Sequence, residues 1–314
     1  MALKPWLCGL LLLVCTGCFG PKFIANNMIG SMKDMKQSFF AEANPDHGFY
    51  AGPALLAQLD GFIFSSPQNA DLLVMGAEMN CGYAMTFLDT RDAEWAASQY
   101  RKGTAYGMRA LKEKNEAIHD ALSRGDEEAL AKELAKVDED DLPFVFWTGM
   151  CWGGLINITQ DATLAADLPL TVALIERSLE IDPGHYFAGG HLFLGMLYGG
   201  RAAMFGGDLA KGKKHYEKAI ELTGGKFVLA RVHYAKFYAV TAQDPELYLQ
   251  ILNEVVSEDV HWPPEMRLAN AVWRAEARKL LDKVGDFFPA WQPPEEVEED
   301  VAPLEEDDEE LDLD

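Results

Sequence analysis

The chain has 314 residues and a formal net charge of −23, from 50 acidic and 27 basic side chains. It contains no basic stripe that could displace counterions from phosphates, which excludes nucleic acid as a partner. Only five cysteines are present and three lie near the start, so an apolar core rather than a disulfide scaffold must hold the fold together.

The first segment is typical of a secretory signal. Lys4 precedes an apolar run of roughly 10 residues, which is too short to cross a bilayer at about 20 residues. Cys15-Thr16-Gly17-Cys18 then resembles a lipoprotein cleavage site, although Cys15 stands where such sites prefer leucine. We therefore expect residues 1–17 to be removed and Cys18 to carry a lipid that anchors the chain. The alternative is an ordinary cleaved signal that leaves Cys18 as a free thiol.

Residues 18–288 are predicted to form one all-α domain. Sustained period-two alternation and Asn-Gly hairpin turns, the signs of strands, are missing from the sequence. Asp167-Leu168-Pro169 is typical of a helix start, whereas Asp182-Pro183-Gly184 and Gly224-Gly225 are typical of helix ends. Short connections make consecutive helices antiparallel neighbours. The predicted helices cover about residues 22–42, 52–64, 69–88, 92–123, 126–136, 142–158, 168–181, 186–203, 208–222, 226–241, 245–257 and 263–285.

The second half of the chain carries an internal repeat that resembles the tetratricopeptide (TPR) unit, two antiparallel helices in about 34 residues. Residues 186–224 fit this unit, with Leu194-Gly195 in the first helix and Gly212 and Tyr216 in the second. We predict a TPR-like solenoid of degenerate helix pairs with additional capping helices. Glycine inside a helix costs about 1 kcal/mol relative to alanine, so the helical glycines indicate close packing or room for a ligand.

The C-terminal segment differs sharply from this domain. Residues 293–314 hold 13 acidic side chains and no Lys or Arg, and the rest of the chain has a net charge of only −10. Such a block cannot bury enough apolar area to offset its ordering entropy. We therefore predict an acidic disordered tail over 289–314, which acts either as a solubilising extension or as a docking arm for a basic partner.

The sequence offers no set of residues for catalysis or for a cofactor. None of the seven histidines has the i, i+4 partner that would present two imidazoles to one metal, and none neighbours a cysteine pair. Nucleophile elbows, phosphate loops and dinucleotide fingerprints are also missing from the sequence. We expect a protein without enzymatic activity, metal or cofactor.

The most informative cluster is apolar and spans residues 144–154. Its two tryptophans, its methionine and its cysteine cannot all face one neighbouring helix, so some are expected to line a concave surface. Ordinary core packing is the alternative. Cys81 and Cys151 are close enough for a disulfide if their helices are adjacent, although adjacency does not require one. The candidate pocket or channel residues are Asn80, Cys81, Trp147, Cys151, Trp152 and Met196.

The run over residues 229–240, followed by Asp244, Leu247-Tyr248 and Leu252, resembles the TPR lipoproteins associated with TRAP transporters, often called the TatT component. Residues 195–199 and 216–220 agree with the same pattern. The resemblance covers roughly residues 15–285 and leaves out the acidic tail.

This resemblance implies an all-helical periplasmic protein that assembles as a homo-oligomer, a trimer, beside the solute-binding protein of a TRAP transporter. Small organic acids or more hydrophobic ligands would pass through an internal channel, and Lys236 is a candidate for holding a carboxylate. Phe19 follows the lipid-bearing cysteine, and by resemblance to Gram-negative lipoproteins this favours the periplasmic side of the outer membrane.

The sequence is therefore compatible with two functions. The first is a lipid-anchored transport accessory with a ligand passage. The second is a TPR scaffold lipoprotein in cell-envelope assembly, with no small-molecule binding. A continuous apolar cavity would favour the first function, and a groove filled by side chains would favour the second.

Overall fold

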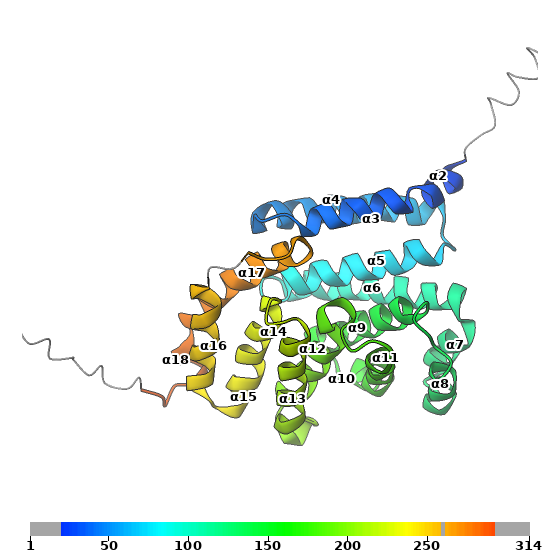
Figure 1. Ribbon diagram of the computed structural model, residues 1–314. Helices are drawn as coiled ribbons and strands as arrows, with labels where there is room; N and C mark the ends of the chain where they lie inside the picture. The colour runs from blue at the N-terminus through cyan, green and yellow to red at the C-terminus, as the bar shows by residue number, and fades with distance from the viewer. Residues whose placement is uncertain (1–19, 259–260, 293–314) are drawn as a thin grey trace, which may run out of the picture.

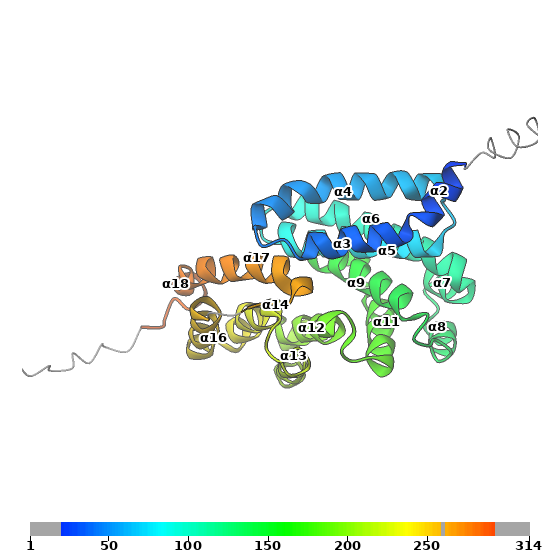
Figure 2. The ribbon, with the colours of Figure 1, turned by 45° about the horizontal axis from the view of Figure 1, so that its top comes forward.

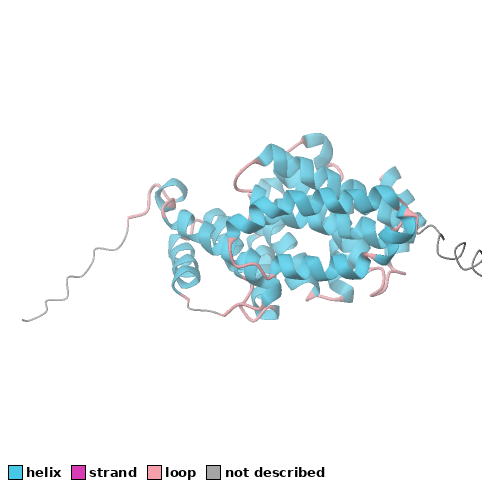
Figure 3. Ribbon diagram, turned by 90° about the horizontal axis from the view of Figure 1, so that it is seen from above, coloured by secondary structure: helices cyan, strands magenta, loops and turns pink. Residues whose placement is uncertain are grey.

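The computed structural model describes residues 20–258 and 261–292, and within these ranges every regular element is a helix (Figures 1 and 3). The prediction of an all-α fold is therefore confirmed. The TPR-like character of the helix pairs stays a prediction. The predicted lipid-bearing Cys18 and the tail from residue 293 lie outside the described residues.

The N-terminal helices form an outer layer over the rest of the chain (Figure 1). They are α2 (Pro21–Asn27), α3 (Ile29–Phe40) and α4 (Pro45–Ser65). The predicted helix over 22–42 is thus two helices, separated at Met28. Helix α4 begins earlier than predicted because the Asn44 side chain accepts hydrogen bonds from the backbone N–H groups of Asp46 and His47.

Three helices pack beneath this layer and form the centre of the molecule. They are α5 (Ala70–Tyr83), α6 (Ala93–Lys114) and α9 (Leu142–Thr159). A disulfide joins Cys81 on α5 to Cys151 on α9, with the two Cα atoms 5.5 Å apart. Gly103 of α6 faces the two sulfurs, and a Cβ there would lie only 2.6 and 2.8 Å from them. The pairing that the sequence left open is therefore present, and a glycine makes room for it.

Four further helices of the described chain flank this centre. The predicted helix over 92–123 is broken at Asn115, whose side chain accepts a hydrogen bond from the Ile118 N–H and starts a new helix. The predicted ends at Asp182 and at Gly224-Gly225 are confirmed, and both glycines have positive φ angles, +57° and +70°. The flanking helices are α7 (Glu116–Arg124), α8 (Glu127–Leu134), α10 (Ala162–Ala165) and α11 (Leu168–Ile181).

The remaining helices form the C-terminal half. Helices α12 (His185–Gly199) and α13 (Leu209–Leu222) make the pair that the repeat predicted: Gly199 abuts Gly212, and Gly195 lies against the Tyr216 ring. The short η2 (Ala203–Phe205) lies between these two helices, and the elements that follow are α14 (Val228–His233), η3 (Tyr234–Ala239), α15 (Val240–Ala242), α16 (Pro245–Ser257), α17 (Pro264–Leu281) and α18 (Val284–Phe287).

Buried side chains fall into two clusters. The larger one, called here the N-terminal core, is built mainly from α4 to α9 and α11, with Leu72, Phe146 and Leu174 at its centre. The smaller one, the C-terminal core, is built from α13 to α17 around Tyr216 and Tyr248. Helix α12 contributes residues to both cores, so it lies at the boundary between them.

Helix α17 closes the fold by packing against α3 and α4 at the start of the chain (Figure 2). Leu268 of this helix fills the space beside Gly48, and the Arg267 guanidinium donates a 3.2 Å hydrogen bond to the carbonyl of Ala41. The two cores are therefore tied together at a second place, far from α12 in the sequence.

Candidate functional site

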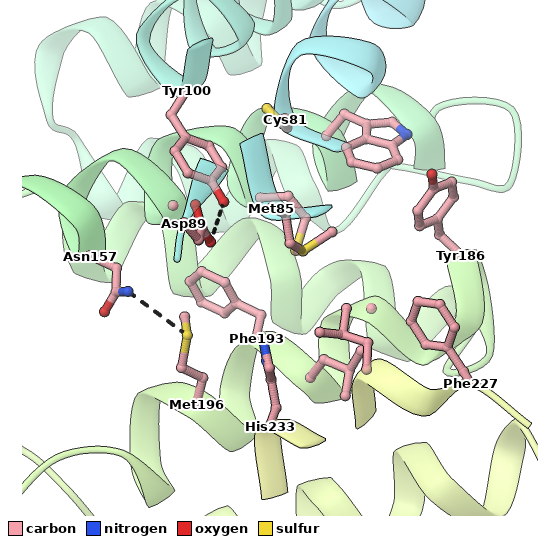
Figure 4. Close-up of a pocket in the computed structure, with 16 residues that line it drawn as sticks. Cys81, Met85, Asp89, Tyr100, Asn157, Tyr186, Phe193, Met196, Phe227 and His233 are labelled. Carbon is pink, nitrogen blue, oxygen red and sulfur yellow. Dashed lines mark hydrogen bonds between the residues drawn. The ribbon is translucent and has the colours of Figure 1, made fainter. Parts of the chain in front are cut away.

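A cavity of about 50 Å³ lies where the two cores meet (Figure 4). One wall comes from α5, α6 and α9 and the opposite wall from α12, Phe227 and α14. Most of its lining is apolar and includes sulfur-bearing and aromatic side chains. Among them are Cys81, Met85, Trp147, Met150, Phe193 and Met196.

A second cavity of about 40 Å³ adjoins the first and extends toward α3 and α17. It is also mainly apolar, with Phe39, Met79 and Leu268 among its lining. The two cavities have one wall in common, and this shared wall is defined by Met85, Tyr186, Phe227 and Leu229. These four side chains therefore separate the two cavities.

The backbone is irregular on both sides of the shared wall. Residues 84–88 form a π-helical segment, η1, between α5 and the loop before α6, and Met85 lies on it. Such segments are rare and are frequent at functional sites. Across the cavity, Tyr186, Phe187 and Ala188 have φ angles of 45°, 58° and 58°. Three successive non-glycine residues in the left-handed region store strain, which persists only where surrounding packing imposes it.

The first cavity has one polar side, at the end of η1. The Tyr100 hydroxyl donates a 3.0 Å hydrogen bond to Oδ2 of Asp89, and Gly154 leaves space for the Tyr100 ring. Oδ1 of Asp89 is buried and has no partner in the described part of the chain. Burial raises the pKa of Asp89 to about 7, against the smaller opposing effects of the Tyr100 hydrogen bond and the Lys236 charge. Asp89 is therefore a carboxyl group that can be neutral near neutral pH.

Two further polar side chains face the same cavity. The Asn157 amide reaches the sulfur of Met196, with 3.9 Å between nitrogen and sulfur (Figure 4). His233 packs edge-on against Phe237 and Trp273, with ring centroids 5.0 and 4.8 Å apart. Burial, assisted by the Lys236 charge, lowers the pKa of His233 to about 3, so this ring is neutral at physiological pH.

The predicted site residues divide into two groups. Cys81, Trp147 and Met196 line the first cavity, and their role in a channel stays a prediction. The cavity face of α9 carries Trp147, Met150, Gly154 and Asn157, spaced three or four residues apart.

The other four predicted residues do not line either cavity. Trp152 is five positions after Trp147 and packs partly buried against the N-terminal core, because this spacing turns it away from the cavity face. Asn80 is buried, and its amide donates to the Gly76 carbonyl at 2.7 Å. Cys151 is the disulfide partner of Cys81. The Lys236 ammonium lies 5.5 Å from the centre of the Phe237 ring, and burial lowers its pKa.

Several residues that line the cavity could not be recognised from the sequence. Asp89 stands in a short polar connection between two predicted helices, a position that predicts a solvated loop residue. Met85 and Tyr186 fall inside predicted helices. Neither the π-helical segment that carries Met85 nor the left-handed turn that carries Tyr186 has a sequence signature. Gly154, a glycine inside a predicted helix, did indicate close packing or extra space at this place.

Among residues 20–258 and 261–292, no group of three or more His, Cys, Asp or Glu side chains is arranged to hold a metal ion. Over the same ranges, no helix combines the length and the apolar character that crossing a membrane requires.

Comparison with known proteins gives one clear match. The family model described as "TRAP transporter T-component" matches residues 47–288, which is well over half of the chain and includes both cavity walls. No curated protein matches the chain.

Proposed function

The chain belongs to the TRAP transporter T-component family, and from this premise we propose that it is an accessory of a TRAP-type transporter. In this proposal its partner is the periplasmic solute-binding protein, and its task is to give that partner's ligand a sheltered path. Cys18 carries the lipid anchor, which holds the protein on the periplasmic side of the outer membrane. The protein works as a homo-oligomer, a trimer, and catalyses no reaction.

One observation carries the ligand passage. Two mainly apolar cavities adjoin each other along the wall of Met85, Tyr186, Phe227 and Leu229. Pockets that bind small molecules are concave and mostly apolar, with a few polar groups that fix the ligand's orientation. Side chains of a pure scaffold would be expected to fill this region, since protein interiors tolerate few voids larger than a water molecule.

The cavities are narrow, and the lining supplies the means to widen them. A cavity of about 50 Å³ has room for only a few water molecules. Met85, Met150 and Met196 line the first cavity, and methionine is unbranched and adapts its shape readily. Ligand entry therefore requires these side chains to change rotamer.

The partner is tested by crosslinking the native lipoprotein in its own cells and identifying the attached proteins by mass spectrometry. A periplasmic solute-binding protein as the dominant partner supports the proposal. Envelope-assembly proteins alone, or crosslinks only between copies of this chain, would support the scaffold function instead.

The passage is tested separately with Met85→Trp, which places a larger side chain in the shared wall. Met204→Trp is the matched control, because Met204 is 83% exposed and far from packing constraints. We expect cells with the first variant to keep the crosslink to the partner but to lose transporter-dependent solute uptake. The control should keep both. Full uptake with Met85→Trp would rule out a passage along the shared wall.

A further inference from the structure

The end of the molecule formed by α2 and the last turn of α4 exposes large apolar side chains. They are called here the N-terminal apolar edge and comprise Phe23, Ile24, Met28 and Phe64. Ile24 is 48% exposed and Phe64 is 86% exposed, and four of the nine large apolar side chains exposed on the described residues belong to this edge. Exposed apolar groups that gather in one place mark contact with another protein or with a membrane.

The two helices that carry this edge are held side by side. Oδ1 of Asn26, on α2, accepts a 2.8 Å hydrogen bond from the hydroxyl of Ser66, the residue that follows α4. Gly61 of α4 lines one open hollow of the surface together with Ile24 and a second hollow together with Phe64. Ile24 and Phe64 therefore lie on one stretch of surface, at the end of the outer layer (Figure 1).

The lipid anchor of the proposed function is attached close to this edge. Cys18 carries that anchor, and a single residue separates it from Gly20, where the described chain begins. Two peptide units span at most about 8 Å, and four residues of helix add about 6 Å. With the lipid in the bilayer, Ile24 therefore lies within about 15 Å of the membrane surface. A tether this short leaves little room for a soluble partner between α2 and the membrane.

The charge of the first helices also matches a membrane surface. Residues 21–40 contain three lysines and one aspartate, which gives a net charge of +2 in a chain of −23. Lys22 and Lys33 are exposed, whereas Lys36 forms an ion pair with Glu78. Basic side chains beside an anchor attract anionic lipid headgroups, which repel the acidic remainder of the chain. Charge and apolar exposure therefore favour the same end of the molecule.

We propose that the N-terminal apolar edge enters the interfacial layer of the membrane that holds the lipid anchor, with Ile24 and Phe64 at the acyl boundary and Lys22 among the headgroups. This inference rests on the proposed function, because it needs the anchor at Cys18. It gives the lipoprotein a second attachment and so fixes its orientation. Helices α16 and α18 lie at the opposite end of the molecule from α2 (Figures 1 and 2), so the C-terminal core faces away from the bilayer.

The test measures how deep single side chains lie in the membrane. The full lipidated chain is bound to vesicles of phosphatidylethanolamine and phosphatidylglycerol, with one nitroxide spin label on an introduced cysteine. That cysteine is the single free thiol of the anchored protein, because residues 1–17 are removed, Cys18 is acylated and Cys81 pairs with Cys151. Collision rates are measured with oxygen, which concentrates in the acyl region, and with a nickel chelate, which stays in water.

The labelled variants are Ile24→Cys and Phe64→Cys, with Met204→Cys as the matched control. Met204 is another large, exposed apolar residue, on the connection between α12 and α13. These two helices lie on the opposite side of α5 from α4 (Figures 1 and 2). We expect the ratio of oxygen to nickel collision rates at residues 24 and 64 to exceed the ratio at residue 204 several-fold. The control also shows whether the label itself draws a side chain into the bilayer.

Two results would overturn the membrane contact. Equal ratios at all three positions would place the edge in water. Labels at residues 24 and 64 that are shielded from both reagents would mean that a second copy or another protein covers the edge. Flotation of the unlabelled chain with the same vesicles reports the anchor separately. Flotation with water-exposed labels would refute the contact alone, whereas loss of flotation would overturn the anchor of the proposed function as well.

Discussion

The two cores of this protein are held together by different means. The N-terminal core is crosslinked by the disulfide between Cys81 and Cys151, whereas the described part of the C-terminal core depends on packing and on hydrogen bonds such as that from Tyr248 to the Leu280 carbonyl. The cavity lies between them, so one of its walls is covalently fixed and the other is not. A binding site with one rigid wall can admit a ligand by small movements of the other wall.

The largest effect is expected from removing the crosslink. The disulfide joins residues 70 positions apart, and the chain-entropy model gives about 4 kcal/mol of stabilisation for a loop of this length. The double variant Cys81→Ala and Cys151→Ala should therefore lose about 4 kcal/mol of unfolding free energy in urea titrations. Reductant should destabilise the wild type and leave the double variant unchanged. If the wild type and the double variant were equally stable without reductant, the disulfide would not distinguish the two cores.

A second effect, of about 2 to 4 kcal/mol at pH 8, is expected for Asp89→Asn. Because the pKa of Asp89 is raised on folding to about 7, the native state holds a proton that the unfolded state has lost. Stability is therefore lost as the pH rises from about 4 to about 7. The variant should be more stable than the wild type at pH 8 and nearly equal to it at pH 4, in urea titrations at both values. A variant less stable at pH 8 would contradict a buried, raised-pKa carboxyl.

A third effect concerns the helix pair of α12 and α13. A Cβ at Gly212 would overlap the Cα of Gly199, so Gly212→Ala forces two backbones apart. We expect a loss of about 1 to 3 kcal/mol, measured by thermal or urea unfolding. Gly61→Ala is the matched control, because this helical glycine has open space around it. Alanine at this position should stabilise the fold by up to about 1 kcal/mol. Similar results at both positions would mean that the close approach is unimportant.

The smallest effect compares two tyrosines of the C-terminal core. Both are fully buried, but the Tyr248 hydroxyl donates a 2.7 Å hydrogen bond to Leu280 while the Tyr216 hydroxyl has no partner in the described residues. Tyr248→Phe should cost about 1 kcal/mol, because it removes this hydrogen bond and leaves the Leu280 carbonyl with only the one from the Lys283 N–H. Tyr216→Phe should be neutral or slightly stabilising. The reverse order in urea titrations would show that the hydrogen-bond assignment is incorrect.

Much of the helical framework could be predicted from the sequence, because local signals determine it. Proline and aspartate begin or end helices, as at Asp167 and Asp182, and small residues indicate close helix contacts, as at Gly199 and Gly212. The break at Asn115 was missed because a capping asparagine inside a polar helical stretch is hard to separate from a solvent-exposed helix residue.

The candidate site could be predicted only in part. Cys81, Trp147 and Met196 were identified because apolar clusters with glycine suggest a concave surface. Asp89 and Tyr186 were missed because their positions depend on a π-helical segment and on a left-handed turn. Both conformations are imposed by tertiary packing rather than by local preference, so periodicity cannot reveal them.

The most direct test of the account is a titration of the methyl-labelled full chain with hexan-1-ol, followed by NMR of the methionine methyl groups. If the boundary between the cores is a ligand-binding cavity, the resonances of Met85, Met150 and Met196 should shift along one common binding curve. Met32, buried away from the cavity, and Met204, exposed to solvent, should stay unchanged. Shifts at all methionines alike, or at none of the three cavity methionines, would contradict the central claim.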